Sequence, residues 1–284
     1  MNSGNTHINS LKKRSPPLIM GVLNVTPDSF SDGGQHNDVE AAVRHALLMV
    51  EQGANIIDIG GESTRPGAET IDTAEQQRRV LPVIEALRKV LPEGFPISID
   101  TTDSEVARSA IAVGVNWLND ISAAEESSEM LDLAAKHDLP IVLMHRQGKS
   151  ATMQEAPYYD DVCTEVVTYL LQRAEVAMQS SVAKERIILD PGIGFGKLFE
   201  HNLSLLKGLP SLCQQGFPVL LGTSRKRFLS TICDERDASK LGVATAATTA
   251  LAVQSGVQVV RVHDVIENRQ AADVAWAIQN NPHP

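Results

Sequence analysis

The sequence predicts a single α/β barrel of eight parallel strands, each followed by a helix, with long loops after the first two strands. The first observation is a series of short apolar runs that are rich in β-branched residues. These runs cover residues 18–24, 55–60, 97–100, 117–120, 141–145, 186–190, 219–224 and 259–264. Continuous apolar runs, rather than alternating ones, are typical of parallel strands that are covered on both faces.

Amphipathic stretches between these runs are the second observation, because their spacing of apolar residues indicates helices. The clearest of them cover residues 39–52, 73–90, 104–113, 162–183 and 241–255. No linker or change in composition divides the series, so the units fit one closed (β/α)8 barrel of the usual size, about 250 residues. An open, doubly wound sheet is the alternative that the pattern alone leaves open.

We expect the barrel domain to cover residues 18–282 and a flexible polar arm to precede it at residues 1–17. The arm carries three basic residues at 12–14, but Ser-Pro-Pro follows where a secretory signal would need a long apolar stretch. No apolar run approaches the roughly 20 residues that span a bilayer.

The composition is that of an ordinary globular protein with an acidic balance. Of the 284 residues, 43% are hydrophobic and 21% are charged, and the net charge is -10. This charge argues against binding to nucleic acid or to an anionic membrane, so an anionic ligand must meet a local group of cations. Cys163, Cys213 and Cys233 are widely spaced, which disfavours a disulfide framework or zinc site and favours a reducing cytoplasm.

Polar residues gather at the carboxyl ends of the predicted strands. They are Asn24, Asp100, Asn119, Asp120, His145, Asp190, Ser224 and His263. In a barrel these ends converge on the catalytic face. The alternative is that each residue caps the following helix, since Asn, Asp and Ser favour that position. Capping gives no reason, however, for Lys226, Arg261 and His263.

Two loops and two basic groups stand out at this face. Residues 24–34 form a long loop that could cover a site, and residues 58–67 form a glycine-rich loop from which Arg65 can reach inward. Taken singly, each loop could also be a surface turn. Basic residues follow the last two strands at 225–227 and at Arg261 and His263. Barrels often bind phosphate there, so we expect an anion site.

The glycines of residues 190–197 loosely match a dinucleotide fingerprint. No helix is expected at the required place after them, and no acidic residue follows a second strand at the required distance. A Rossmann interpretation is therefore rejected.

Eight segments of the chain resemble the motifs of the dihydropteroate synthases. They read MGVLNVTPDSFSDGG, DIGGESTRPG, SIDT, NDIS, MH at residues 144 and 145, DPGIGFGK, GTSRK and RVHDV. The segments stand in the family's order and cover nearly the whole chain from Leu18 to Val265. The resemblance implies a transferase of folate biosynthesis. It would join 6-hydroxymethyl-7,8-dihydropterin pyrophosphate to p-aminobenzoate, giving 7,8-dihydropteroate and pyrophosphate.

The resemblance implies three neighbouring subsites. It assigns the pterin pocket to Asp100, Asn119, Met144, Asp190, Phe195, Gly222 and Lys226. It assigns pyrophosphate to Asn24, Arg65, Arg261 and His263, with Asn24 also ligating a Mg2+ ion. It assigns p-aminobenzoate to Phe30, Thr64, Pro66 and Lys226, near the start of the seventh helix. Catalysis would then depend on Asp100, Lys226, Arg261 and His263.

The chemistry of the ligands agrees with these implied roles. A carboxylate such as Asp190 complements the N–H edge of a pterin, and an ammonium such as Lys226 complements its carbonyl. Asp100 can stabilise positive charge that develops on the ring. One amide oxygen binds a hard cation weakly, so Mg2+ should bind well only when substrate phosphates and water complete its shell.

Two positions depart from familiar family members. Residue 227 is Arg where some members have a Ser that contacts the p-aminobenzoate carboxylate, so either Arg227 or backbone amides could bind that group. Arg146 stands where familiar members have Met, and we expect it to be peripheral. The family resemblance also implies a homodimer, and the Ala-rich stretch 243–252 could pack closely against a partner. Sulfonamides, which mimic p-aminobenzoate, would inhibit the enzyme.

Three other classes of protein were weighed. A pterin-binding methyltransferase domain would share the barrel and the carboxylates but would not need the cations proposed for pyrophosphate. An inactive pterin-binding protein would have lost catalytic residues that this chain retains. An unrelated aldolase would need a Schiff-base lysine at a strand end, and Lys226 fits that position poorly.

Overall fold

Eight parallel strands form the centre of the molecule in the computed structural model, which describes residues 15–26, 35–62, 71–148 and 152–280. The strands are β1 (Leu18–Asn24), β2 (Ile56–Gly60), β3 (Ile97–Asp100), β4 (Trp117–Asp120), β5 (Ile141–Met144), β6 (Ile187–Asp190), β7 (Leu220–Gly222) and β8 (Val259–Val262). Their order is β6-β5-β4-β3-β2-β1-β8-β7. A parallel bridge between Leu189 and Val219 joins β6 to β7 and closes the ring. The predicted (β/α)8 barrel is therefore confirmed.

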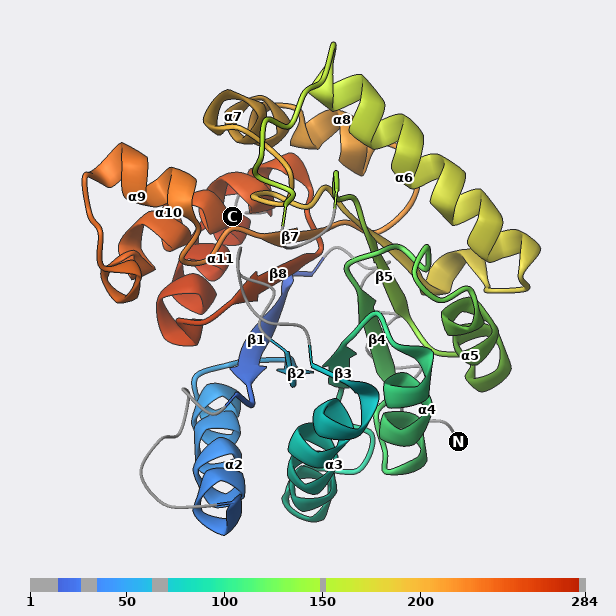
Figure 1. The fold of residues 1–284 in the computed structure, drawn as a ribbon. Coiled ribbons are helices and arrows are strands. Elements are labelled where there is room, and N and C mark those ends of the chain that lie inside the picture. Colours follow the sequence, from blue (N-terminus) through green and yellow to red (C-terminus); the bar gives the residue numbers. More distant parts are fainter. Residues whose placement is uncertain (1–14, 27–34, 63–70, 149–151, 281–284) are drawn as a thin grey trace.

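Helices surround the strands, as Figure 1 shows. They are α2 (Gln35–Glu51), α3 (Thr73–Val90), α4 (Ser104–Ala112), α5 (Glu129–His137), α6 (Val162–Gln179), α7 (Phe199–Lys207), α8 (Leu209–Cys213), α9 (Arg227–Cys233), α10 (Gly242–Ser255) and α11 (Val265–Asn280). The five helices predicted most clearly are all present. The predicted helix at 162–183 was too long, because the chain turns after Gln179 and Ser181 adopts a left-handed conformation with φ 68°.

The core divides into two clusters because successive strand residues point to opposite faces. A small cluster takes side chains from every strand except β3. Its members are Leu18, Met20, Ile56, Trp117, Val142, Ile188, Leu220 and Val259. A larger cluster joins the outer faces of the strands to helix residues such as Ala42, Val80 and Val166. The small cluster matches the packed interior of a barrel.

Strand periodicity then positions the polar residues at one end of that interior. A residue two or four positions beyond a member of the small cluster points the same way. By this rule Asn24 lies on the same face of β1 as Met20, and Asn119 lies on the same face of β4 as Trp117. Arg261 likewise shares a face with Val259 on β8.

No helix in the described ranges is long and apolar enough to cross a membrane. Short polar caps fix where helices begin. Asp103, for example, accepts hydrogen bonds from the backbone N–H groups of Glu105 and Val106 at the start of α4. Its other carboxylate oxygen accepts one from Thr73 Oγ1 at 2.5 Å, which ties α4 to the start of α3.

Candidate active site

Four residues at the ends of β1 to β4 lie side by side at the mouth of the barrel. The strand register pairs Asn24 with Gly60, Gly60 with Asp100, and Asp100 with Asn119. Because Gly60 has no side chain, the space beside it stays open. A Cβ at that position would lie 3.7 Å from Asn24 Oδ1 and 3.7 Å from Asp100 Cβ. The structure thus brings the predicted ligands of pyrophosphate and pterin together.

A hydrogen-bond network of two carboxylates, one guanidinium and one amide includes Asp100 and Asn119 of this row. Arg261 donates from Nε to Asp58 Oδ2 and from Nη2 to Asp100 Oδ2, both at 2.6 Å. Asp58 Oδ2 also accepts a hydrogen bond from Asn119 Nδ2 at 3.0 Å. β8, β2, β3 and β4 are therefore joined through their side chains. Two of the five N–H groups of Arg261 are used by the two carboxylates.

Asp58 was not among the site residues predicted from the sequence, because those predictions considered polar residues at strand ends. Asp58 is fully buried in the middle of the apolar strand β2, and it shares a face with Gly60. A carboxylate inside an otherwise apolar strand needs a charged or hydrogen-bonding partner, so its position was the signal that could have identified it. Its Oδ1 is a buried atom with no hydrogen-bond partner among the described residues.

The electrostatics of this network follow from burial and from the opposed charges. Burial raises the pKa of Asp100, and Arg261 opposes that rise while Asp58 adds to it. Burial alone would lower the pKa of Arg261, but the neighbouring carboxylates Asp58 and Asp100 outweigh it and raise the pKa instead. Arg261 therefore stays protonated, and Asp100 is more easily protonated than an exposed aspartate.

On the opposite side of the barrel, the loop after β6 brings Asp190, Phe195 and Lys226 together. Lys226 Nζ donates to the carbonyl oxygen of Ile193 and lies 4.4 Å from the centre of the Phe195 ring. Burial raises the pKa of Asp190, and the Lys226 ammonium opposes the rise. Burial also lowers the pKa of Lys226 to about 8, with Asp190 opposing the fall. A carboxylate at the end of β6 and an ammonium in the loop after β7 therefore each favour the charged form of the other.

The turn that follows Asp190 requires glycine at residue 192. Asp190 Oδ1 accepts a hydrogen bond from the Gly192 N–H at 2.7 Å, and Gly192 has a φ of +66°. A Cβ at this position would lie 1.9 Å from the carbonyl oxygen of His145. No side chain fits there. Met144 is buried beside this turn, and β5 and β6 pair Met144 with Asp190.

The ends of β7 and β8 hold the remaining predicted cations in different ways. Gly222 pairs with Arg261 across the two strands. His263 lies just beyond β8; its backbone N–H donates to Ser224 Oγ at 3.1 Å, and its ring Nδ1 lies 3.0 Å from the same oxygen. Arg225, by contrast, forms an ion pair with Asp264 at 2.7 Å. The Ser224 hydroxyl therefore fixes the position of His263.

Several sequence expectations are resolved or fall outside the described residues. Arg227 is exposed at the start of α9. Arg146 forms an ion pair with Glu126. The remaining predicted site residues, which are Phe30, Thr64, Arg65 and Pro66, lie outside the described residues.

The helix-capping explanation does not apply to Asp120, because the next helix after β4 begins only at Glu129. Asp120 accepts hydrogen bonds from the backbone N–H groups of Ser122 and Ala124 and from the Ser122 hydroxyl. It therefore stabilises the turn after β4. Burial raises the pKa of Asp120 to about 6, and these hydrogen bonds oppose the rise.

Among the described residues, no group of three or more His, Cys, Asp or Glu side chains is arranged to hold a metal ion. Asn24, beside Asp100 across Gly60, supplies an oxygen donor at the mouth of the barrel. In the part of the chain that the structure describes, this single amide oxygen fits a cation that is bound mainly by substrate oxygens and water.

The barrel and its mouth match known proteins over nearly their whole length. The family model described as pterin binding enzyme matches residues 20–263. The chain is 48% identical over 260 residues to a dihydropteroate synthase of Synechocystis, which covers 92% of this chain and 89% of the relative. A solved dihydropteroate synthase of Xanthomonas albilineans with 4-aminobenzoic acid has a TM-score of 0.88 at 44% identity, covering 95% of both chains.

A dihydropteroate synthase of Yersinia pestis, solved with a sulfonamide drug complex, has a TM-score of 0.87 at 40% identity. It covers 94% of this chain and 96% of its own. A barrel with buried carboxylates and cations at its mouth, matched by the pterin-binding model, is a pterin-binding enzyme. The chain belongs, within that class, to the dihydropteroate synthase family. The expected transferase activity in folate biosynthesis is thereby confirmed, and the methyltransferase alternative is not supported.

Proposed function

We propose that the active site at the mouth of the barrel catalyses the condensation of the pterin pyrophosphate with p-aminobenzoate. Each of its side chains has a separate role. Asp190 accepts hydrogen bonds from the N–H edge of the pterin, and Lys226 donates to its carbonyl side. Asp100 and Asn119 bind the ring from the opposite wall. Met144, Phe195 and Gly222 shape the pocket. The observation that carries this proposal is the single network in which Arg261 joins Asp58 to Asp100, beside Asn119.

In the reaction, the bond between the methylene carbon and the pyrophosphate oxygen breaks, and its electron pair leaves with pyrophosphate. The amine nitrogen of p-aminobenzoate then forms the new bond to that carbon and loses a proton. Arg261, His263 and Arg65 stabilise the negative charge that grows on the leaving group. Asp100 stabilises the positive charge that spreads over the pterin. A strong general base is unnecessary, because an aniline nitrogen is neutral at pH 7.

A Mg2+ ion fits this scheme as a partner of the substrate. Asn24 would hold it, together with substrate oxygens and water, and the ion would supply further charge stabilisation for pyrophosphate. Binding of Mg2+ should therefore depend on the pterin substrate. Titration calorimetry with Mg2+ alone should detect no tight binding, whereas Mg2+ added with inorganic pyrophosphate should bind. Equal binding of Mg2+ in both cases would contradict the proposal.

The p-aminobenzoate site is assigned to the two loops that follow β1 and β2. Phe30, Thr64 and Pro66 would contact the ring, and Lys226 would lie near the carboxylate. Arg227 is exposed at the start of α9 and could reach the same carboxylate. Replacing Arg227 by Ser should raise the KM for p-aminobenzoate without changing the KM for the pterin substrate.

Pyrophosphate release from 6-hydroxymethyl-7,8-dihydropterin pyrophosphate tests the proposal directly. Release should require p-aminobenzoate and Mg2+ and should match dihydropteroate formation. Asp190→Asn should abolish pterin binding while circular dichroism shows an intact fold. Asp132→Asn, an exposed position on α5, serves as the control. Pterin binding by Asp190→Asn at the native affinity would refute the assignment.

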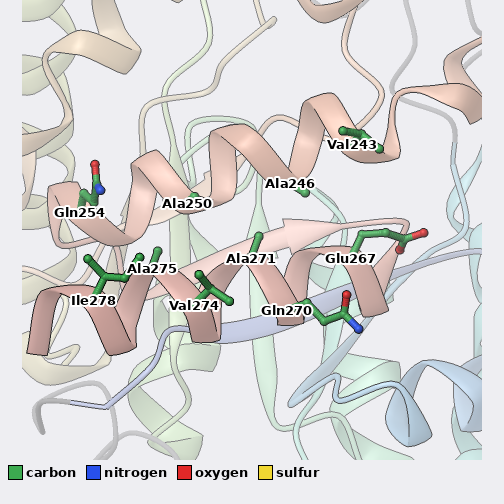
Figure 2. Close-up of a pocket in the computed structure, with 10 residues that line it drawn as sticks. All are labelled: Val243, Ala246, Ala250, Gln254, Glu267, Gln270, Ala271, Val274, Ala275 and Ile278. Atoms are coloured by element: carbon green, nitrogen blue, oxygen red, sulfur yellow. The ribbon is translucent and has the colours of Figure 1, made fainter. Parts of the chain in front are cut away.

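A homodimer is the second part of the proposal, and a groove between α10 and α11 supports it. The groove has a volume of about 450 Å³, and Figure 2 shows the residues that line it on the two helices. Most of them are apolar, and the polar ones are Gln254, Glu267 and Gln270. Val243, Val274 and Ile278 line it and are 80%, 60% and 72% exposed. Exposed apolar side chains of this kind often mark an interface. The alanines beside them on both helices would let a second copy of this chain pack closely, and the family resemblance implies such a copy as the occupant.

The oligomeric state tests this interface. Val274→Glu should convert the dimer to a monomer in sedimentation experiments. Val90→Glu, at an exposed apolar position near the end of α3, should leave it unchanged. A monomeric native protein would exclude the dimer. Beyond this, the cytoplasmic location, the arm at residues 1–17 and the domain limits of 18–282 stay predictions from the sequence.

A further inference from the structure

A buried lysine ends the loop at residues 190–197, here called the pterin loop, and has no role in the site described so far. Lys197 is only 3% exposed. Its Nζ lies 2.9 Å from His145 Nδ1 and donates to the carbonyl oxygens of Phe195 at 3.0 Å and His145 at 3.3 Å. These three contacts match the three N–H groups of an ammonium. Burying a lysine is costly, so its presence here needs a reason beyond filling space.

Neutral side chains also hold the backbone of the pterin loop. Tyr159 Oη donates to the Gly196 carbonyl oxygen at 2.8 Å. Asn202 Oδ1 accepts from the Gly194 N–H at 2.7 Å, and Gln154 Nε2 donates to the Gly194 carbonyl oxygen at 2.6 Å. These bonds can fix the backbone without any charge. Lys197 differs from them because its ammonium carries a positive charge, which favours the ionised form of Asp190.

The charges around Asp190 show what that addition does. Burial raises the pKa of Asp190, and three cations oppose the rise, namely Lys226, Arg261 and Lys197. In return, burial lowers the pKa of Lys197 to about 7, while Asp190 opposes the fall and Lys226 adds to it. Lys226 and Arg261 are also proposed to contact the substrate, whereas Lys197 is buried and bonds to His145 and to the Phe195 carbonyl oxygen.

We propose that Lys197 is a positioning residue for the reaction, which fixes the Phe195 carbonyl and keeps Asp190 in its carboxylate form for the pterin. His145 completes the arrangement, because its Nδ1 accepts from the ammonium only when the ring is neutral. Burial and the adjacent Lys197 both favour that neutral form, since they lower the pKa of His145 to about 3. The inference rests on the proposed pterin role of Asp190.

Three variants separate the charge of Lys197 from its hydrogen bonds. Lys197→Gln keeps a donor for the carbonyl groups but removes the charge, and Lys197→Arg keeps the charge. Tyr159→Phe removes one loop hydrogen bond without changing any charge. Lys136→Met, at an exposed position on α5, is the control for loss of a surface charge. For each variant, kcat and both KM values are measured from pH 5 to about pH 9, together with the thermal midpoint.

Loss of the charge should raise the pKa of Asp190, so the acid limb of kcat/KM for the pterin substrate should move to higher pH in Lys197→Gln. A shift of one pH unit corresponds to about a tenfold rise in the KM for the pterin substrate on that limb. The KM for p-aminobenzoate should stay unchanged in Lys197→Gln. Tyr159→Phe and Lys197→Arg should both keep the native acid limb of kcat/KM for the pterin substrate.

If Lys197→Gln and Tyr159→Phe lower the thermal midpoint alike and neither moves the acid limb, Lys197 is only a structural anchor and the inference is wrong. If Lys197→Gln does not fold, Lys197→Arg still tests the inference. This variant keeps the charge, so a shift in the acid limb of its kcat/KM profile would contradict the inference. Asp190→Asn keeps the two proposals apart. Native pterin binding by that variant refutes the proposed role of Asp190, whatever the Lys197 variants do.

Discussion

Arg261 Nη2 donates to Asp100 Oδ2 at 2.6 Å, so the proposed pyrophosphate ligand and the proposed pterin ligand are directly joined. The guanidinium also donates to Asp58, which is fully buried. The Asp100 carboxylate that is proposed to bind the pterin therefore already forms an ion pair with Arg261. Arg261 is in turn the cation proposed to bind the pyrophosphate leaving group. This coupling gives the first two predictions.

Replacing Arg261 by Lys should reduce kcat/KM for the pterin substrate by roughly a hundredfold, although the charge is kept. A lysine ammonium cannot donate to Asp58 and Asp100 with the planar two-pronged geometry of a guanidinium. Steady-state kinetics at saturating p-aminobenzoate measure this effect. Arg108→Lys, in an exposed ion pair with Glu105, is the matched control and should retain full activity. Native kinetics in Arg261→Lys would show that the two-pronged contact has no role.

Replacing Asp58 by Asn should lower the free energy of unfolding by about 1–3 kcal/mol, because hydrogen bonds to charged groups contribute in this range. The amide keeps the size of the side chain but weakens its hydrogen bonds with Arg261 and Asn119. Urea denaturation measures the loss, and kinetics of the same sample should show a higher KM for the pterin substrate. An unchanged KM would mean that Asp58 stabilises the fold but does not position the site.

Deprotonation of Lys226 should lower the activity as pH rises, whereas its contribution to the stability of the folded state should increase. Its folded-state pKa is lowered to about 8 by burial, whereas a lysine in an unfolded chain titrates near 10.4. Activity should fall as pH rises through about 8, because the neutral amine no longer complements the pterin carbonyl. Between these two values the unfolded chain binds the additional proton, so this residue makes the folded state more stable as pH rises.

Kinetics and urea denaturation across this pH range check both signs. Lys197 titrates nearby, with a pKa lowered to about 7, so the discriminating comparison is Lys226→Arg. A guanidinium stays charged, and the alkaline fall that belongs to residue 226 should disappear in this variant. An alkaline limb that persists at the same pH would assign the titration to another group.

Gly192→Ala should disrupt the pterin loop more than an ordinary glycine substitution. A left-handed residue with a Cβ costs about 1–2 kcal/mol, and the clash with the His145 carbonyl oxygen should add a further 1–3 kcal/mol or so. Gly216→Ala is the matched control, because Gly216 has a φ of +80° but its nearest neighbour, Lys184 Nζ, is 3.6 Å from the Cβ position. Thermal unfolding and pterin affinity of both variants test this, and equal losses would contradict the close contact.

Much of the fold follows from local patterns that the sequence displays. The strands at 97–100 and 117–120 have the predicted limits, because apolar runs between turn residues determine where a strand begins and ends. The strand predicted at 259–264 was too long, since His263 leaves the ladder to bond Ser224. Helix α9 begins next to Lys226, where the family resemblance placed the start of the seventh helix, but its seven residues give no amphipathic period long enough to recognise from the pattern alone.

The sequence by itself determined which strand ends carry polar residues, and the rule that parallel strands converge indicated that these residues would meet. Only the tertiary structure decided which of them bond one another. Arg261 reaches Asp58 across 203 positions in the chain, and Lys197 reaches His145 across 52. Local periodicity sets the direction of each side chain, but barrel closure sets the neighbour it meets. That closure depends on the packing of all eight strands at once, and no short segment encodes it.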